Sequence, residues 1–246
     1  SCQATINVAK DQALLQLMHE AGVRMMFIGI ETPRAASLAE THKYQNMRTD
    51  LLQDIEAVQS HGIIVTIGSV VGFDHDDAAI FDEQVEFVQR AKVTVILANQ
   101  LVALPGTPLY HRLRQEGRLR EEIRWNTDER YVESNFVPSQ MSSRQLTTGF
   151  LSMLLRWYDP EQFAQRLLGE LERLDRMPGG TGSVMIEFPV VCLGLAWVFG
   201  WFVCDRHRRV MLRLFWRVVP EMVPPLMVAF EEVKLMARRV VPEALV

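Results

Sequence analysis

The sequence predicts an α/β fold, a partial (β/α) TIM-like barrel followed by an α-helical C-terminal region. Apolar runs at 25–31, 63–72 and 93–102 each follow a segment with an amphipathic helical period. Strands that alternate with helices form parallel sheets, in which the strands are buried on both faces and read as apolar runs. Each run ends in an unusual turn rich in Gly, Pro or acidic residues. Such sheets place their chemistry at the carboxyl ends of the strands, so the turns predict part of an active-site rim.

The first repeat begins with a strand-like stretch at 3–8 and continues with a helix at 11–21. Asp11 is the expected N-cap of this helix, and Gly22 stands just past its end, where glycine favours helix termination. The strand at 25–31 follows directly. We therefore expect one complete βαβ unit here.

The second and third repeats have the same organisation. A helix at 46–62 precedes the strand at 63–72, and a helix capped by Asp76 or Asp77 precedes the strand at 93–102. Together with the opening stretch this gives four parallel strands. Four strands are too few to close a barrel and enough for half of one.

The pattern changes after residue 102. A helix is predicted at 107–117, with Thr107 as its N-cap and Pro108 at its first position. Further helices are predicted at 142–158, with a capping box of Ser142 and Gln145, and at 160–177, and a loop is predicted at 119–138. We divide the chain near residue 135. Residues 1–135 are the expected barrel part, and residues 136–246 are the expected helical region.

Composition limits the possible functions. Hydrophobic residues make up 48% of the 246 residues and charged ones 23%, which allows a packed core. The net charge of −4 argues against nucleic-acid binding. Cys2, Cys192 and Cys204 are too far apart for a disulfide framework or a clustered metal site, so a reducing, cytoplasmic location is expected. Because the chain opens without an initiator Met or a signal peptide, we expect it to be part of a longer protein.

Glu31 is the most informative single residue, because a carboxylate that ends an apolar strand is costly unless it meets a partner. It could accept hydrogen bonds from the amine or hydroxyls of a ligand. It could equally pair with a nearby Arg or Lys, or cap a helix opened by Thr32 and Pro33. Its position does not separate these interpretations.

Gly68 and Gly72 bracket the end of the strand at 63–72, with Val70 between them. Glycine inside a strand weakens it and often marks the close approach of another group. A cofactor ring could lie against Val70, with the glycines making room. A bulge or a tight bend is the alternative, and the residues alone favour it.

The acidic run that follows is explained by local structure. Asp74, Asp76 and Asp77 stand with His75 near a predicted helix N-terminus, where carboxylates are favoured by capping and by the helix dipole. No further ligands have metal-like spacing. We therefore predict no metal site here.

Several motifs occur together in a specific order and spacing: FIGIETP at 27–33, HKYQN at 42–46, VVGFDHD at 70–76, IF at 80–81 and LPGTPLY at 104–110. In this combination the chain resembles the radical S-adenosylmethionine enzymes, most closely the class with an N-terminal cobalamin-binding domain. NFVP at 135–138, with the helical tail after it, is similar to the uncharacterised cap domain of one branch of that class. The resemblance covers the chain to about residue 158.

The resemblance implies that these strands are the third to sixth of a six-stranded partial barrel. It implies that Glu31 contacts the amino-acid or ribose part of S-adenosylmethionine. It also implies that Gly68, Val70 and Gly72 form the motif whose aliphatic residue packs on the adenine. That motif usually ends in an acidic residue, where this chain has His75.

The resemblance further implies a 4Fe-4S cluster, cobalamin, and methyl transfer to an unactivated carbon of a small-molecule or lipid substrate. The family binds its cluster through a Cys-x3-Cys-x2-Cys loop, and this chain has no such loop. We therefore expect the chain to be inactive by itself, as the C-terminal part of a longer enzyme. The alternative is a non-catalytic, membrane-associated module with a degenerate half-barrel. An ordinary metabolic (β/α) barrel is disfavoured, because no glycine-rich phosphate loop is present.

The apolar tail predicts contact with a membrane. Residues 184–204 are long enough to span a bilayer and are followed by several arginines, but Glu187 and Pro189 lie inside the stretch. Residues 210–219 carry arginines four apart on a hydrophobic helix, which suits a membrane surface. We expect a buried or interfacial helix, with peripheral contact through 184–219 at the inner face of the membrane.

Overall fold

The computed structural model describes residues 1–40, 44–47, 49–120 and 134–175. The chain divides into two compact units, Ser1–Met185 and Ile186–Val246, and the described residues all belong to the first. The boundary near residue 135 stays a prediction. The expected tail at 184–219 lies outside the described residues. Among the helices that are described, none is long and apolar enough to cross a membrane.

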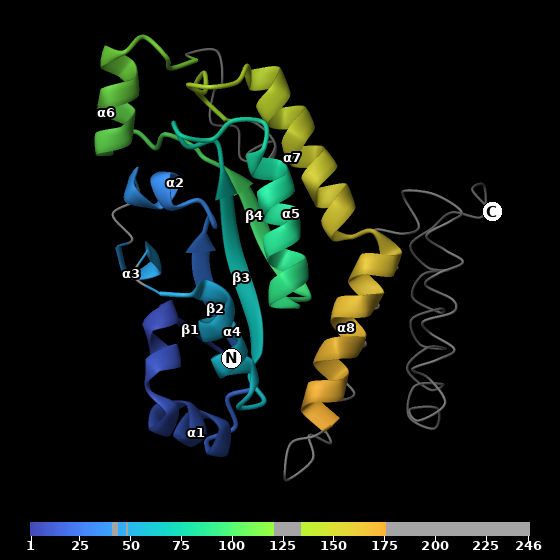
Figure 1. The fold of residues 1–246 in the computed structure, drawn as a ribbon. Coiled ribbons are helices and arrows are strands. Elements are labelled where there is room, and N and C mark those ends of the chain that lie inside the picture. Colours follow the sequence, from blue (N-terminus) through green and yellow to red (C-terminus); the bar gives the residue numbers. More distant parts are fainter. Residues whose placement is uncertain (41–43, 48, 121–133, 176–246) are drawn as a thin grey trace, which may run out of the picture. The chain divides into compact units, whose positions relative to one another are not determined.

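The sheet has four parallel strands in the sequential order β1 (Cys2–Ala4), β2 (Met25–Glu31), β3 (Ile64–Val71) and β4 (Val95–Gln100). Parallel strands that follow one another with right-handed crossovers place their helices on one face of the sheet. This order is that of a (β/α) barrel, and a doubly wound sheet would reverse direction. The fold is therefore the predicted partial (β/α) barrel followed by a helical region (Figure 1).

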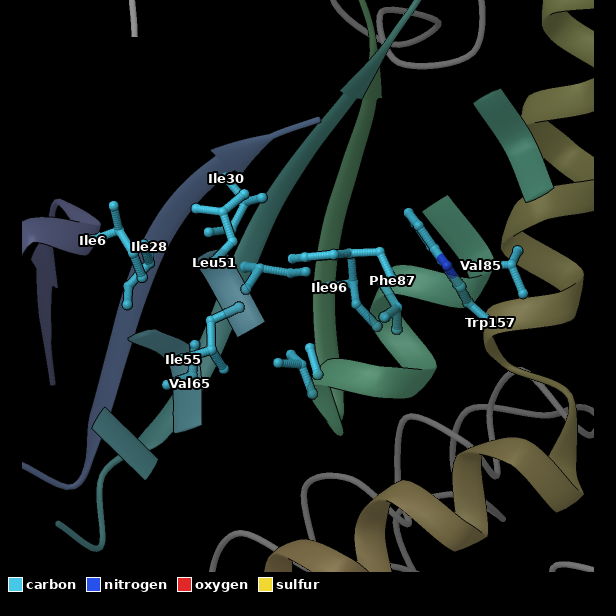
Figure 2. Packing of buried hydrophobic residues seen from close by; sticks show 14 of the residues in the cluster. Ile6, Ile28, Ile30, Leu51, Ile55, Val65, Val85, Phe87, Ile96 and Trp157 are labelled. Atoms are coloured by element: carbon cyan, nitrogen blue, oxygen red, sulfur yellow. The ribbon is translucent and has the colours of Figure 1, made fainter. Parts of the chain in front are cut away.

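Helices cover one face of this sheet, which we call the helix face. The main ones are α1 (Gln12–Glu20), α4 (Leu51–Gln59), α5 (Ile80–Ala91) and α7 (Ser143–Trp157). The core lies between them and the sheet (Figure 2). Ile28, Val65 and Ile96 contribute from the strands, and Ile55, Phe87 and Trp157 contribute from the helices. The strand residues that alternate with them point to the opposite face, which we call the inner face.

Several predicted element ends are confirmed by their caps. Asp11 caps α1 through the N–H of Leu14, and Gly22 follows the helix with a φ of +85°. Thr107 caps α6 (Pro108–Gln115) with Pro108 in the first turn, and Ser142 and Gln145 form the predicted capping box of α7. The last described helix, α8 (Pro160–Asp175), begins where predicted. These helix ends could be predicted because capping depends only on residues that are close together in the sequence.

Three sequence expectations were wrong. The stretch 3–8 is a strand only over Cys2–Ala4 and then turns into a 3-10 helix, η1 (Ile6–Lys10), which buries Ile6 and Ala9. The helix predicted at 46–62 starts only at Leu51, capped by Asp50, after the short helices α2 (Ala35–Glu40) and α3 (Tyr44–Met47).

The third error concerns the cap of α5. This helix starts at Ile80 after Ala79, which makes no side-chain cap, so neither Asp76 nor Asp77 is its N-cap. Asp76 instead accepts hydrogen bonds from the backbone N–H groups of Gly72 and Phe73, at 2.8 and 3.1 Å. Its carboxylate therefore closes the turn at the end of β3.

Candidate functional site at the carboxyl ends of the strands

Glu31 ends β2 in an unusual backbone conformation. Its φ is +68°, and the N–H of Thr32 donates to the carbonyl of Ile30 at 3.0 Å. A hydrogen bond between the residues on either side of a central residue with positive φ defines the rare, strained form of the γ-turn. The left-handed region disfavours any residue other than glycine, with a partial exception for Asn and Asp. Strain of this kind clusters at functional sites, so the conformation of Glu31 is an argument for function.

A β-bulge accompanies this turn. The register between β2 and β3 shifts between Gly29 and Glu31, so that Glu31 lies opposite Ser69. Buried side chains satisfy the backbone carbonyls that the bulge disturbs. The amide nitrogen of Asn46 donates to the carbonyls of Gly29 and Ile30 at 3.2 and 3.0 Å. That of Gln84 donates to the carbonyl of Glu31 at 3.3 Å.

The two residues near Glu31 in the sequence that bear on its alternative roles, Arg34 and Thr32, have partners of their own. The nearby basic residue Arg34 pairs with Asp77 and Glu83. At the turn itself, the hydroxyl of Thr32 accepts a hydrogen bond from the N–H of Arg34 at 3.2 Å. Thr32 therefore provides the local side-chain cap of the turn. Glu31 itself is half-buried on the strand end.

The inner face beside Glu31 carries glycines and apolar side chains. Gly29 of β2, Gly68 of β3 and Leu97 of β4 lie side by side in register. In the next register step towards the carboxyl ends, Val70 lies beside Asn99. The two adjacent glycines place no Cβ on this part of the face. Leu97 is 54% exposed, an unusual position for a leucine within a sheet.

Gly68 has a neighbour that explains part of its role. A Cβ built at Gly68 would lie 2.8 Å from Cζ of Phe27, closer than real Cβ contacts. The Phe27 ring therefore extends over Gly68 from the register step below. The glycine makes room for this ring, and the ring forms part of the inner-face floor.

Gly72 lies at the same strand end but faces elsewhere. Its φ is +106°, and a Cβ there would lie 3.2 Å from Cδ2 of Leu146 in α7, on the helix face. Glycine is needed at this position by the turn that Asp76 closes. Burial raises the pKa of Asp76, although Ser37 and the two backbone N–H groups lower it. The structure thus groups Glu31, Gly68 and Val70 on adjoining strand ends and places Gly72 in the turn beyond them.

The acidic run after Gly72 forms ion pairs. The carboxylate of Glu40 accepts from the backbone N–H groups of Asp74 and His75 and pairs with the His75 ring. Asp74 pairs with Arg112 and Arg118, at 2.5 and 2.7 Å. Burial raises the pKa of Asp74, but the two arginines outweigh it and the net pKa is lowered. Across the described residues, no group of three or more His, Cys, Asp or Glu could hold a metal ion.

Sequence reasoning missed several residues of this site. Leu97 and Asn99 were missed because the sequence does not show which side chains of the strand face inward, and only the register with Gly68 and Val70 shows it. Asn46 and Gln84 looked like ordinary helix residues. Polar amides within amphipathic helical segments were the available signal, since buried polar groups need partners.

The fold is that of an α/β protein, and its candidate site residues lie at the carboxyl ends of a half-barrel. A family model described as a domain of unknown function (DUF4070) matches residues 107–229, which is half of the chain. The chain is 35% identical over 166 residues to a hopanoid C-2 methylase of Rhodopseudomonas palustris, covering 68% of this chain. It is 31% identical over 164 residues to an uncharacterized methyltransferase of Synechocystis sp., covering 67% of this chain.

The chain therefore belongs to the DUF4070 family, and these matches confirm its resemblance to the radical S-adenosylmethionine enzymes. It spans 30% of the length of each of the two relatives.

Proposed function

We propose that this chain forms the S-adenosylmethionine-binding part of a radical S-adenosylmethionine methyltransferase. The single observation that carries the proposal is the strained turn at Glu31, which lies beside the in-register glycines Gly29 and Gly68. The methylase and methyltransferase names of the two relatives support the type of reaction.

Each site residue has a role that its geometry allows. The carboxylate of Glu31 accepts hydrogen bonds from the amine or the ribose hydroxyls of the cofactor, and its negative charge complements the cationic sulfonium compound. Val70 packs on the adenine ring. Gly68 contributes indirectly, because it makes room for the Phe27 ring that forms part of the inner-face floor. Gly72 acts through the turn that holds the end of β3, since its Cβ position faces Leu146 on the helix face.

The described residues do not fit an iron–sulfur cluster. They contain one free cysteine, Cys2, and cluster ligation needs three thiolates that converge. We propose that the cluster and cobalamin of the enzyme are held by segments outside this chain. The chain alone would then be inactive.

The inner face also suggests the kind of substrate. Leu97, Val70 and Phe27 make its central part apolar, and Asn99 supplies an exposed amide at the edge. An apolar small molecule or lipid suits such a surface, because its binding removes exposed hydrocarbon from water. One relative is named for methylating a hopanoid.

The test is a substitution of Glu31 in the complete polypeptide with its cluster reconstituted. Glu31→Gln keeps the size of the side chain and removes its charge, and it should weaken equilibrium binding of S-adenosylmethionine about tenfold. The control is Glu86→Gln, because Glu86 is exposed on α5 and pairs only with Arg90 among the ion pairs of the described chain. Equal affinity of wild type and Glu31→Gln, measured by calorimetry, would remove Glu31 from the site.

A further inference from the structure

Gln84 of α5 is a buried amide that connects two strand ends. It is 1% exposed. Its Nε2 donates to the carbonyl of Glu31 at 3.3 Å and to that of Val70 at 3.5 Å. Its Oε1 accepts from the hydroxyl of Ser69 at 2.9 Å. The side-chain amide of Gln84 thus donates two hydrogen bonds and accepts one at the carboxyl ends of β2 and β3.

These contacts fall at the β-bulge. The bulge shifts the register between Gly29 and Glu31, so the regular strand ladder is interrupted there. A buried carbonyl without a donor costs the free energy of its lost hydrogen bond to water. A strained turn persists only where the surroundings over-determine it. Gln84 supplies a donor to the carbonyl of Glu31 from the helix layer, and Asn46 supplies donors to the carbonyls of Gly29 and Ile30.

The position of Gln84 is itself fixed. The indole N–H of Trp157, a residue with no exposed surface in α7, donates to the backbone carbonyl of Gln84 at 3.3 Å. This turn of α5 is therefore held between α7 and the sheet. Rotation of the Gln84 side chain is restricted as well, because Ser69 occupies its acceptor.

We propose that Gln84 is a positioning residue, which sets the spacing between the Glu31 turn and Val70 and so presents both to the same small molecule. This inference deepens the proposed function and rests on it for the identity of that molecule. Neither a glutamate nor a methionine could replace the amide: an ionised carboxylate has no hydrogen to donate, and a thioether can make none of these bonds as a donor.

The first test compares Gln84→Met with Gln89→Met in the complete, reconstituted polypeptide. Gln89 lies on the same helix and makes its side-chain hydrogen bonds with Gln165 and Arg166 of α8. At a temperature where circular dichroism shows all variants folded, Gln84→Met should bind S-adenosylmethionine at least fivefold more weakly. Gln89→Met should bind it like the wild type. Equal affinity of Gln84→Met and the wild type overturns the proposal, because a purely structural role would lower stability alone.

The second variant, Gln84→Glu, keeps the size of the side chain and adds a pH signature. Burial next to carbonyl oxygens disfavours its ionised form. At low pH its protonated carboxyl can donate to the Glu31 carbonyl, so affinity should recover as pH falls, relative to the wild type at the same pH. Absence of any recovery in a folded Gln84→Glu protein contradicts the proposal. If Gln84→Met fails to fold, Gln84→Glu still tests the positioning role of Gln84.

Hydrogen exchange separates this proposal from the proposed function. Without any ligand, Gln84→Met should increase exchange of the Thr32 amide, which closes the Glu31 turn, about tenfold, and Gln89→Met should not. If the wild type fails to bind S-adenosylmethionine, the proposed function fails, and faster exchange at Thr32 still supports Gln84 as the residue that holds the turn. Unchanged exchange overturns its positioning role.

Discussion

At the scale of single residues, Glu31 and Lys92 are the two non-glycine residues at positive φ in the described part of the chain, at +68° and +52°. Lys92 is explained by its place, because it is the C-cap of α5, where a left-handed residue ends a helix. Glu31 lies in a strand-end turn that glycine would form at lower cost. The proposed role of Glu31 in cofactor binding accounts for a glutamate at this position.

A pair of substitutions tests this contrast. Lys92→Gly should raise the free energy of unfolding by about 1 kcal/mol, because it removes left-handed strain, and should leave S-adenosylmethionine binding unchanged. Glu31→Gly should not lower the free energy of unfolding, yet it should abolish most of that binding. Urea titration and calorimetry measure the two quantities. A clear loss of stability in Glu31→Gly would show that the residue serves the fold.

At the scale of elements, the contact between α5 and α7 depends on one glycine. A Cβ built at Gly149 of α7 would lie 2.1 Å from Cε2 of Phe81 in α5. The Phe81 ring therefore lies directly against the backbone of α7. Phe81 and its neighbour Phe150 belong to the main core, so the two helices meet through closely packed hydrocarbon.

Gly149→Ala should consequently lower the free energy of unfolding by about 1–3 kcal/mol, because the added methyl forces Phe81 to move. Gly169→Ala is the matched control. It lies inside α8, where a Cβ would meet nothing within 4 Å. Alanine should stabilise that helix by about 0.5–1 kcal/mol. Urea unfolding measures both changes. An unchanged free energy of unfolding in Gly149→Ala would show that Phe81 can move aside at no cost.

At the scale of the whole molecule, α8 brings a buried carboxyl group to the sheet. Glu170 is 2% exposed and accepts a hydrogen bond from the hydroxyl of Thr94, just before β4. Burial raises the pKa of Glu170 to about 7, against the hydrogen bond from Thr94 and the charges of Arg173 and Arg166. Its Oε1 has no hydrogen-bond partner among the described residues.

The folded chain thus keeps a proton on Glu170 that the unfolded chain releases near pH 4.5. The free energy of unfolding should fall as pH rises from about 4.5 to 7, by about 3 kcal/mol, and should then level off. Glu170→Gln keeps an acceptor for Thr94 and should remove most of this slope. Urea titrations at pH 5 and 8 measure it. An equal slope in wild type and variant would assign the pH dependence to other groups.

Much of the fold could be predicted from the sequence. The strand at Met25–Glu31, the caps at Asp11, Thr107 and Ser142, and the parallel half-barrel were all confirmed. The spacing of apolar residues and the capping of helices depend on residues close together in the sequence. A single segment is therefore enough to predict each element. The late start of α4 was not predictable in this way, because the separate short helices α2 and α3 precede it.

The sequence by itself determined the half-barrel and the presence of Glu31, Gly68 and Val70 at strand ends. Only the tertiary structure decided which of these residues share a surface. It turned Gly72 towards Leu146, put Phe27 over Gly68, and set Asn46 and Gln84 on the carbonyls of the bulge. The physical reason is that register and burial depend on partners far away in the chain. A lone carboxylate or amide in a sequence does not carry that information.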